Sequence, residues 1–121
     1  MPDDQVHRYK RSIAEDAQLA LQADPNDHLD WVVITAFYQA LHWVDAFLAK
    51  TQRHPGDHRN RNREVKQDVY LKAIKRHYKR LYDASLSARY YPNTYRNRPN
   101  EVQRLLETDL QSIIDHISPL L

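Results

Sequence analysis

The amino-acid sequence predicts an all-α protein, an antiparallel four-helix bundle with one extra short helix. Glycine occurs once in 121 residues, so the chain lacks the turns that a sandwich or a barrel needs between many short strands. Apolar residues recur at spacings of three and four along four long segments, and short polar breaks separate these segments, as in helices that pack side by side. The length fits one domain, residues 1–121, with a single core.

The first half of the chain supplies two of the long helices. Asp3 or Asp4 can cap the first, which stops at Asp24-Pro25-Asn26 and carries an apolar stripe of Val6, Tyr9, Ile13, Ala17, Ala20 and Leu21. The second begins at about Asn26 or Asp27. Its run LDWVVITAFYQALHWVDAFLAK is apolar on nearly every side, which predicts a helix in the centre of the bundle. Polar residues interrupt the run, so we do not expect it to span a membrane.

The second half supplies a short helix at 62–68, a long helix at 69–91 and a last helix that starts at Pro99, with Asn97 or a neighbour as its cap. The long helix is expected to bury Leu71, Ile74, Tyr78, Leu81, Ser85 and Ala88, and to expose Lys72, Lys75, Arg76, Lys79 and Arg80. In the last helix one face carries Val102, Leu105, Leu106, Leu110, Ile113, Ile114 and Ile117.

Several kinds of chemistry lack the residues they need. Cysteine is absent, which excludes disulfides and thiolate metal sites. No Glu-x-x-His, His-Glu-x-x-His or glycine-rich phosphate loop occurs, and Pro55-Gly56 separates His54 from His58, so the two histidines cannot share a helical face. We therefore expect no metal and no cofactor. The acidic and polar start, MPDDQVHRYK, has no apolar signal segment, and we expect a cytoplasmic protein.

The net charge of +2 conceals a strongly basic middle of the chain. Residues 1–49 carry a net charge of −5, whereas residues 50–66 carry +4 and residues 72–104 carry +7. A polycation of this kind attracts nucleic acid, although a solvated basic face that binds nothing has the same composition.

The arginine-rich loop RHPGDHRNRNR, residues 53–63, combines histidine with arginine. Histidine can take and return a proton near neutral pH, and arginine can hold phosphate oxygens through a fixed fork of donors. Together they suffice to cleave RNA without a metal. In this reading Pro55 and Gly56 bring His58 to the phosphate, while Arg59, Asn62 and Arg63 present donors. In the structural reading Pro-Gly-Asp ends one helix and caps the next, and His58 bonds a backbone carbonyl.

Two further groups of residues are candidates for binding. Thr35, Gln39, His42 and Asp45 line up on one face of the second helix beside Tyr38, which indicates either a partly exposed or interface stripe or a functional polar seam. In SARYYPNTYRNR, tyrosines alternate with arginines, as where unpaired bases stack on rings, although aromatic residues at a helix end also serve as core or dimer contacts.

These motifs resemble the HEPN superfamily, small helical bundles named for higher eukaryote and prokaryote nucleotide binding. The resemblance rests on AFYQALHWVDAFLAK, HPGDH, RNRNRE and LYDASLSARYY, and it covers roughly residues 5–118. Many members are metal-independent ribonucleases of toxin or defence type, whose motif is an arginine, a polar residue and, a few residues later, a histidine. Arg53 to His58 fits that form. The resemblance implies a homodimer with the cleft between two copies, and Arg89 and Tyr90 match a recurrent polar helix end.

The leading hypothesis is therefore a homodimeric endoribonuclease in which His58 is the general acid or base and Arg53 the transition-state clamp. Arg59, Asn62, Arg63, Arg89 and Tyr90 would hold the RNA strand. The resemblance also implies an antitoxin or a nucleotidyltransferase as a partner protein. The alternative is a non-catalytic module that binds a nucleotide or such a partner, and a third class is a structural dimer without a ligand.

Overall fold

The computed structural model describes residues 28–91 and 93–121, and within these ranges every regular element is helical. The expected all-α class is confirmed for the described chain. The first predicted helix, with its stripe and its caps between residues 3 and 26, lies outside the described residues. The elements are α2 (Leu29–Lys50), α3 (His58–Gln67), η1 (Leu71–Ile74), α4 (Lys75–Tyr90), α5 (Pro99–Arg104), η2 (Leu105–Leu110), α6 (Gln111–Ile117) and η3 (Ser118–Leu120).

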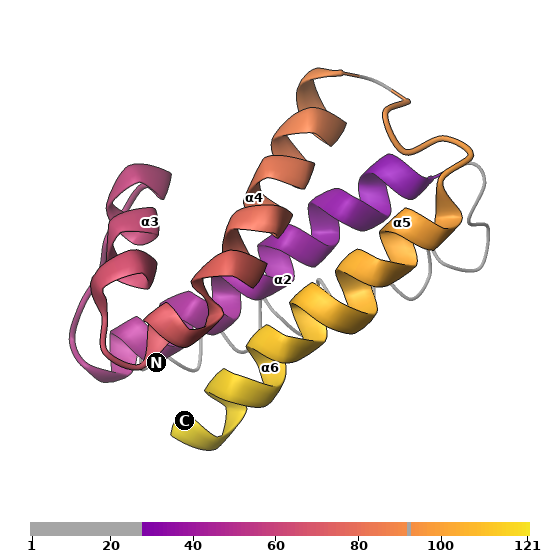
Figure 1. The fold of residues 1–121 in the computed structure, drawn as a ribbon. Helices are drawn as coiled ribbons and strands as arrows, with labels where there is room; N and C mark the ends of the chain where they lie inside the picture. Colours follow the sequence, from indigo (N-terminus) through magenta and orange to yellow (C-terminus); the bar gives the residue numbers. More distant parts are fainter. Residues whose placement is uncertain (1–27, 92) are drawn as a thin grey trace.

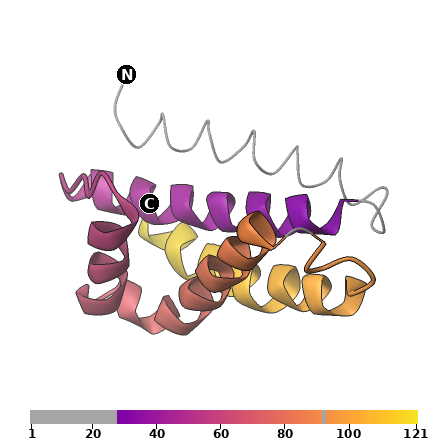
Figure 2. The same cartoon turned by 90° about the horizontal axis from the view of Figure 1, so that it is seen from above.

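Helix α2 packs against α4 and against the run from α5 to α6, which lie on the same side of it in Figures 1 and 2. Apolar side chains on nearly all sides of α2 are buried, and Val33, Ala36 and Phe37 are fully enclosed. The expected burial of this helix is confirmed, and its place in the centre of a four-helix bundle stays a prediction. By length and composition α2 could also cross a membrane, but 72% of its most apolar window is buried inside the fold. Burial in a core accounts for that composition.

Helix α4 shows the predicted division between an inward and an outward face. All six residues of the inward stripe are buried, and all five basic residues beside it are exposed. The start of the helix differs from the expectation, because a 3₁₀ turn, η1, precedes α4. The Asp68 carboxylate accepts hydrogen bonds from the backbone N–H groups of Tyr70 (2.7 Å) and Leu71 (3.0 Å). Asp68 also ends α3, so the helix predicted from residue 69 begins as the 3₁₀ turn η1 at Leu71 and becomes an α-helix only at Lys75.

The last helix is continuous but contains a wider turn. Pro99 occupies its first turn, as predicted, whereas Arg98 stands at the cap without a side-chain bond. Of the two predicted alternatives, Asn97 or a neighbour, the neighbour Arg98 occupies the cap position, and Asn97 adopts a left-handed φ of 67° that turns the chain before the helix. Between α5 and α6, η2 is a π-helix. It carries Asp109, whose buried carboxylate accepts bonds from His77 Nδ1 (2.8 Å) and Arg80 Nη1 (2.9 Å) of α4.

The connection from α4 to α5 is tied to the start of α2. Asp30 accepts hydrogen bonds from the backbone N–H groups of Asn93 (2.6 Å) and Tyr95 (2.8 Å). Tyr95 is buried with Leu29 and Val33 in a second apolar cluster at this end of the fold. The connecting loop therefore folds back over the first turn of α2.

Candidate functional site

The turn HPGD places His58 at the first position of α3. Gly56 has φ of 79°, in the left-handed region where a side chain is disfavoured, so the single glycine of the chain stands where the turn needs it. Asp57 caps the helix, because its carboxylate accepts the backbone N–H of Asn60 at 2.8 Å. The short helix predicted at 62–68 therefore starts earlier, at His58, and the capping role of the Pro-Gly-Asp turn is confirmed.

A buried ion pair fastens α3 to α2. Arg61 Nε donates to Asp45 Oδ1 at 2.7 Å and Arg61 Nη2 donates to Asp45 Oδ2 at 2.9 Å, a two-pronged arrangement. Both side chains are 9% exposed. Burial alone works to lower the pKa of Arg61, but the hydrogen bonds and the charge of Asp45 outweigh it and raise that pKa, so Arg61 stays charged.

His58 lies beside this pair, half-buried against two aromatic rings. Its ring centroid is 5.8 Å from that of Phe37 and 5.7 Å from that of Tyr82. Arg61 Nη1 lies 3.4 Å from His58 Nδ1, and because a guanidinium group only donates, this contact fits a neutral imidazole. Desolvation, followed by the positive charges of Arg61 and Arg89, lowers the pKa of His58. The ring is therefore uncharged, and able to accept a proton, at pH values where an ordinary histidine is partly protonated.

Arg89 and Tyr38 are linked to His58 through Phe37, because the Tyr38 and His58 rings both pack against Phe37 and Arg89 bonds Tyr38. Arg89 Nη1 donates to the Tyr38 hydroxyl at 3.0 Å, and the Arg89 guanidinium carbon lies 5.6 Å from the centroid of the exposed Tyr90 ring. Tyr38 in turn packs edge-on against Phe37 at 5.4 Å. Tyr38 from the predicted polar seam and Arg89 from the predicted strand-holding residues are 51 positions apart in the sequence and form a hydrogen bond in the fold. We call His58, Arg61, Arg89 and Tyr38 the His58 cluster.

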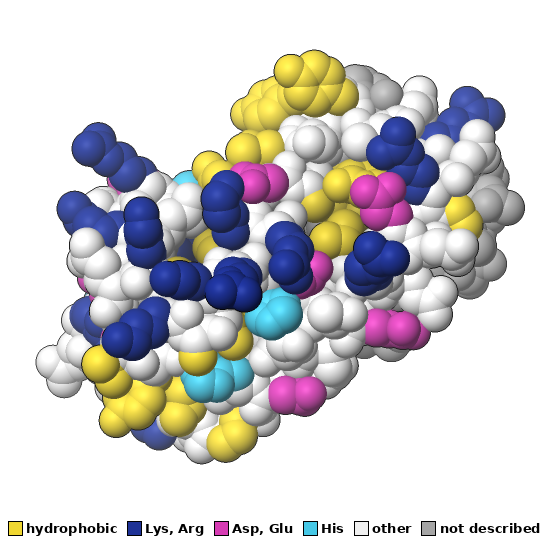
Figure 3. All heavy atoms as spheres, in the orientation of Figure 1, with side chains coloured by type: hydrophobic (Ala, Val, Ile, Leu, Met, Phe, Trp, Pro, Cys, Tyr) yellow, Lys and Arg dark blue, Asp and Glu magenta, His cyan; other side chains and the backbone are white. Residues whose placement is uncertain are grey.

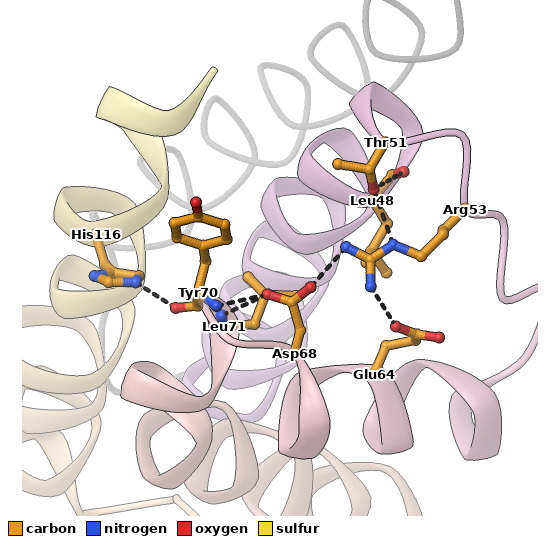
Figure 4. A network of polar contacts seen from close by, with 8 residues as sticks. All are labelled: Leu48, Thr51, Arg53, Glu64, Asp68, Tyr70, Leu71 and His116. Atoms are coloured by element: carbon orange, nitrogen blue, oxygen red, sulfur yellow. Dashed lines mark hydrogen bonds and ion pairs between the residues drawn. The ribbon is translucent and has the colours of Figure 1, made fainter.

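Arg53, the predicted transition-state clamp, lies with its guanidinium between two acidic side chains. Nη1 bonds Glu64 at 2.7 Å, Nη2 bonds Asp68 at 2.6 Å and Nε donates to Thr51 Oγ1 at 2.9 Å (Figure 4). Burial opposes the ionisation of Asp68, but the bonds from Arg53 and from the Leu71 and Tyr70 backbone hold its pKa below the usual range. Arg53 therefore fixes the loop to the far end of α3, and its role as a clamp stays a prediction.

The remaining predicted strand-holding residues of α3 do not share one environment. Arg59 and Arg63 are exposed, and Arg63 Nη2 bonds Asn60 Oδ1 at 2.7 Å. Asn62 is half-buried, and its buried Oδ1 has no hydrogen-bond partner among the described residues. Asn62 therefore does not point outward beside the two arginines. Lys and Arg side chains gather over α3 and α4 on the face in Figure 3, in agreement with the predicted basic surface.

The polar stripe of α2 is part buried and part exposed, and whether it is an interface or a functional seam stays a prediction. Gln39 and Asp45 are buried, and Thr35 and His42 are half-buried. Thr35 Oγ1 donates to the Val32 carbonyl at 3.0 Å, within the same helix. Asp45 can be buried because Arg61 neutralises it. Asp45 is therefore the member of the stripe that contacts the His58 cluster, through its hydrogen bonds with Arg61.

Sequence reasoning missed Arg61 and Tyr82. A signal for Arg61 exists, since His58, Arg61 and Val65 recur at spacings of three and four and form the inward face of α3.

The described residues contain no group of three or more side chains suited to a metal ion. No protein-family model, curated protein or solved structure matches the chain. The functional argument therefore rests on the residues themselves: a histidine whose pKa is lowered by desolvation and by the charges of Arg61 and Arg89 can accept a proton, and arginine side chains can hold a phosphate.

Proposed function

We propose that the protein is a HEPN-like helical bundle that acts on RNA as a metal-independent endoribonuclease, with His58 and Arg89 at its active site. The observation that supports it is the environment of His58, which is half-buried, lies 3.4 Å from Arg61 Nη1 and has its pKa lowered by desolvation and by the charges of Arg61 and Arg89. Arg61 is held by the Asp45 carboxylate, whereas Arg89 is exposed and donates to the Tyr38 hydroxyl. Arg89 is therefore the cation that can turn to a phosphate.

The reaction needs three groups around the cleaved bond. A neutral His58 accepts the proton of a ribose 2′-hydroxyl, and the 2′-oxygen attacks the adjacent phosphorus. Arg89 donates to the phosphate oxygens as their negative charge increases in the phosphorane. The bond to the 5′-oxygen then breaks, and that oxygen takes a proton from a general acid. The products are a 2′,3′-cyclic phosphate and a 5′-hydroxyl.

The general acid is the reason to propose a homodimer. One copy supplies one histidine to this cluster, and a single histidine that has just accepted a proton cannot be the acid on the opposite side of the phosphorus. A second copy placed across a two-fold axis brings a second His58. A molecular mass of a monomer in solution, measured by light scattering on an RNA-cleaving sample, would contradict this part of the proposal.

The test is cleavage of RNA in EDTA by the wild type, His58→Ala and His54→Ala. His54 is an exposed residue of the same loop and serves as the matched control. We expect the wild type and His54→Ala to yield 2′,3′-cyclic phosphate ends, and His58→Ala to lose activity while its circular dichroism spectrum is unchanged. Arg89→Ala should lose most of the activity, and Arg89→Lys less. Cleavage by His58→Ala at the wild-type rate, or no cleavage of RNA by any of them, would overturn the proposal.

A further inference from the structure

A pocket of about 740 Å³ lies next to the His58 cluster, between the start of α2, the end of α4 and the loop that follows α4. This volume is in the range of sites that hold a small organic ligand, about 300–1,000 Å³. The described residues that line it are His28, Leu29, Asp30, Trp31, Ile34, Tyr38, Ala88, Arg89, Asn93 and Arg96. They combine aromatic, aliphatic and cationic side chains.

The charge of the pocket favours an anion. Asp30 is the one acidic side chain among the described lining residues, and it already accepts two backbone hydrogen bonds, from Asn93 and Tyr95. Arg89 and Arg96 are exposed, and the lining thus holds two cations against one occupied carboxylate. A ligand with phosphate oxygens gains hydrogen bonds from both guanidinium groups.

Trp31 gives the pocket an exposed flat ring. It is 59% exposed, whereas Trp43, the other tryptophan of the chain, is 7% exposed. An aromatic ring in contact with water beside arginine side chains is the arrangement on which unpaired bases stack. A base inside a duplex cannot reach such a ring, because both of its faces are already stacked.

We propose that this pocket binds an unpaired base and its phosphate from a single strand of RNA, with Trp31 as the stacking surface and Arg96 as the phosphate contact. Tyr38 and Arg89 line the pocket, and Tyr38 packs against Phe37, the same ring on which His58 lies, so the pocket adjoins the His58 cluster. The bound base is therefore close to the ribose 2′-hydroxyl from which His58 takes a proton, a step that rests on the proposed function. The pocket then selects where an RNA is cut, by selecting the neighbouring base.

The test measures binding separately from cleavage, in the His58→Ala background, where RNA is expected to stay intact. The probes are a fluorescent eight-nucleotide single-stranded RNA, the same sequence as a duplex, and AMP. We expect Trp31→Ala to raise the dissociation constant for the single strand by about 5- to 150-fold, which is the binding free energy of one stacked base expressed as a fold-change. Arg96→Glu should also raise the dissociation constant, and it should make binding less dependent on salt concentration. Tyr70→Ala removes an exposed ring that is not among the residues lining the pocket, and should leave the constant unchanged.

Each outcome decides for or against the pocket. An unchanged dissociation constant in both Trp31→Ala and Arg96→Glu, with spectra of folded protein, would overturn the inference. AMP or duplex bound as tightly as the single strand would overturn the assignment to an unpaired base in a strand. Loss of binding in Trp31→Ala together with cleavage that does not need His58 would support the pocket and reject the proposed active site.

Discussion

The ion pair of Arg61 with Asp45 determines how firmly α3 is held against α2. Helix α3 buries only Arg61 and Val65, so the pair accounts for a large part of its attachment. Arg61→Met keeps most of the side-chain volume but removes both hydrogen bonds and leaves a carboxylate that is 9% exposed without its cation. Hydrogen bonds to charged groups are worth about 1.5–3 kcal/mol each, and breaking a buried pair costs about 3–5 kcal/mol. We expect a loss of about 3–5 kcal/mol in the free energy of unfolding.

Urea denaturation followed by circular dichroism measures this loss. Lys79→Met is the matched control, because its 2.8 Å bond to Asp83 joins side chains that are 74% and 55% exposed, and such a pair is worth less than about 1 kcal/mol. The double variant Arg61→Met with Asp45→Leu should regain much of the stability, since it leaves no unpaired charge. A loss below about 1 kcal/mol for Arg61→Met, no larger than that of the control, would refute the view that this pair holds α3.

Two other predictions concern pH and the loop after α4. His58 has a pKa below the ordinary value of 6.5 in the folded protein, so the unfolded chain binds more protons between the two values and the free energy of unfolding rises with pH there. His58→Gln should reduce this rise in the free energy of unfolding, which urea midpoints measured at pH values from below to above 6.5 would detect. A pH profile identical to that of the wild type would contradict a lowered pKa of His58. Asp30→Ala removes the acceptor of the Asn93 and Tyr95 amides, and should cost about 1–3 kcal/mol and accelerate hydrogen exchange at those two amides. Unchanged exchange there would show that the loop is held by packing of Tyr95 alone.

The inward faces of the helices could be predicted from the sequence because periodicity reports burial directly. The stripe from Leu71 to Ala88 has a spacing that only a helix brings to one side, and every member is buried. The burial of α2 followed from the same logic, since a helix that is apolar all round has no side to expose.

The composition of the candidate site could not be predicted in the same way. Arg59, Arg61 and Arg63 look alike in the sequence, and the buried one is the residue that faces Asp45, which depends on how α3 lies across α2. The meeting of Tyr38 with Arg89 likewise depends on the crossing of α2 and α4. Periodicity fixes which side of a helix is buried, but it does not fix the angle between two helices.

The π-helical segment η2 determines where the length of this chain can change. A residue in an α-helix advances by about 100° around the axis, and a π turn holds more residues than an α turn. The wider turn therefore accommodates one extra residue without rotating the helix that follows it. Deleting Thr108, an exposed residue, would convert η2 into an ordinary α turn, and Ile113 and Ile117, both fully buried, would stay on the side that faces the core. The same deletion in the regular helix α4 would rotate every later residue by about 100° and expose its buried stripe.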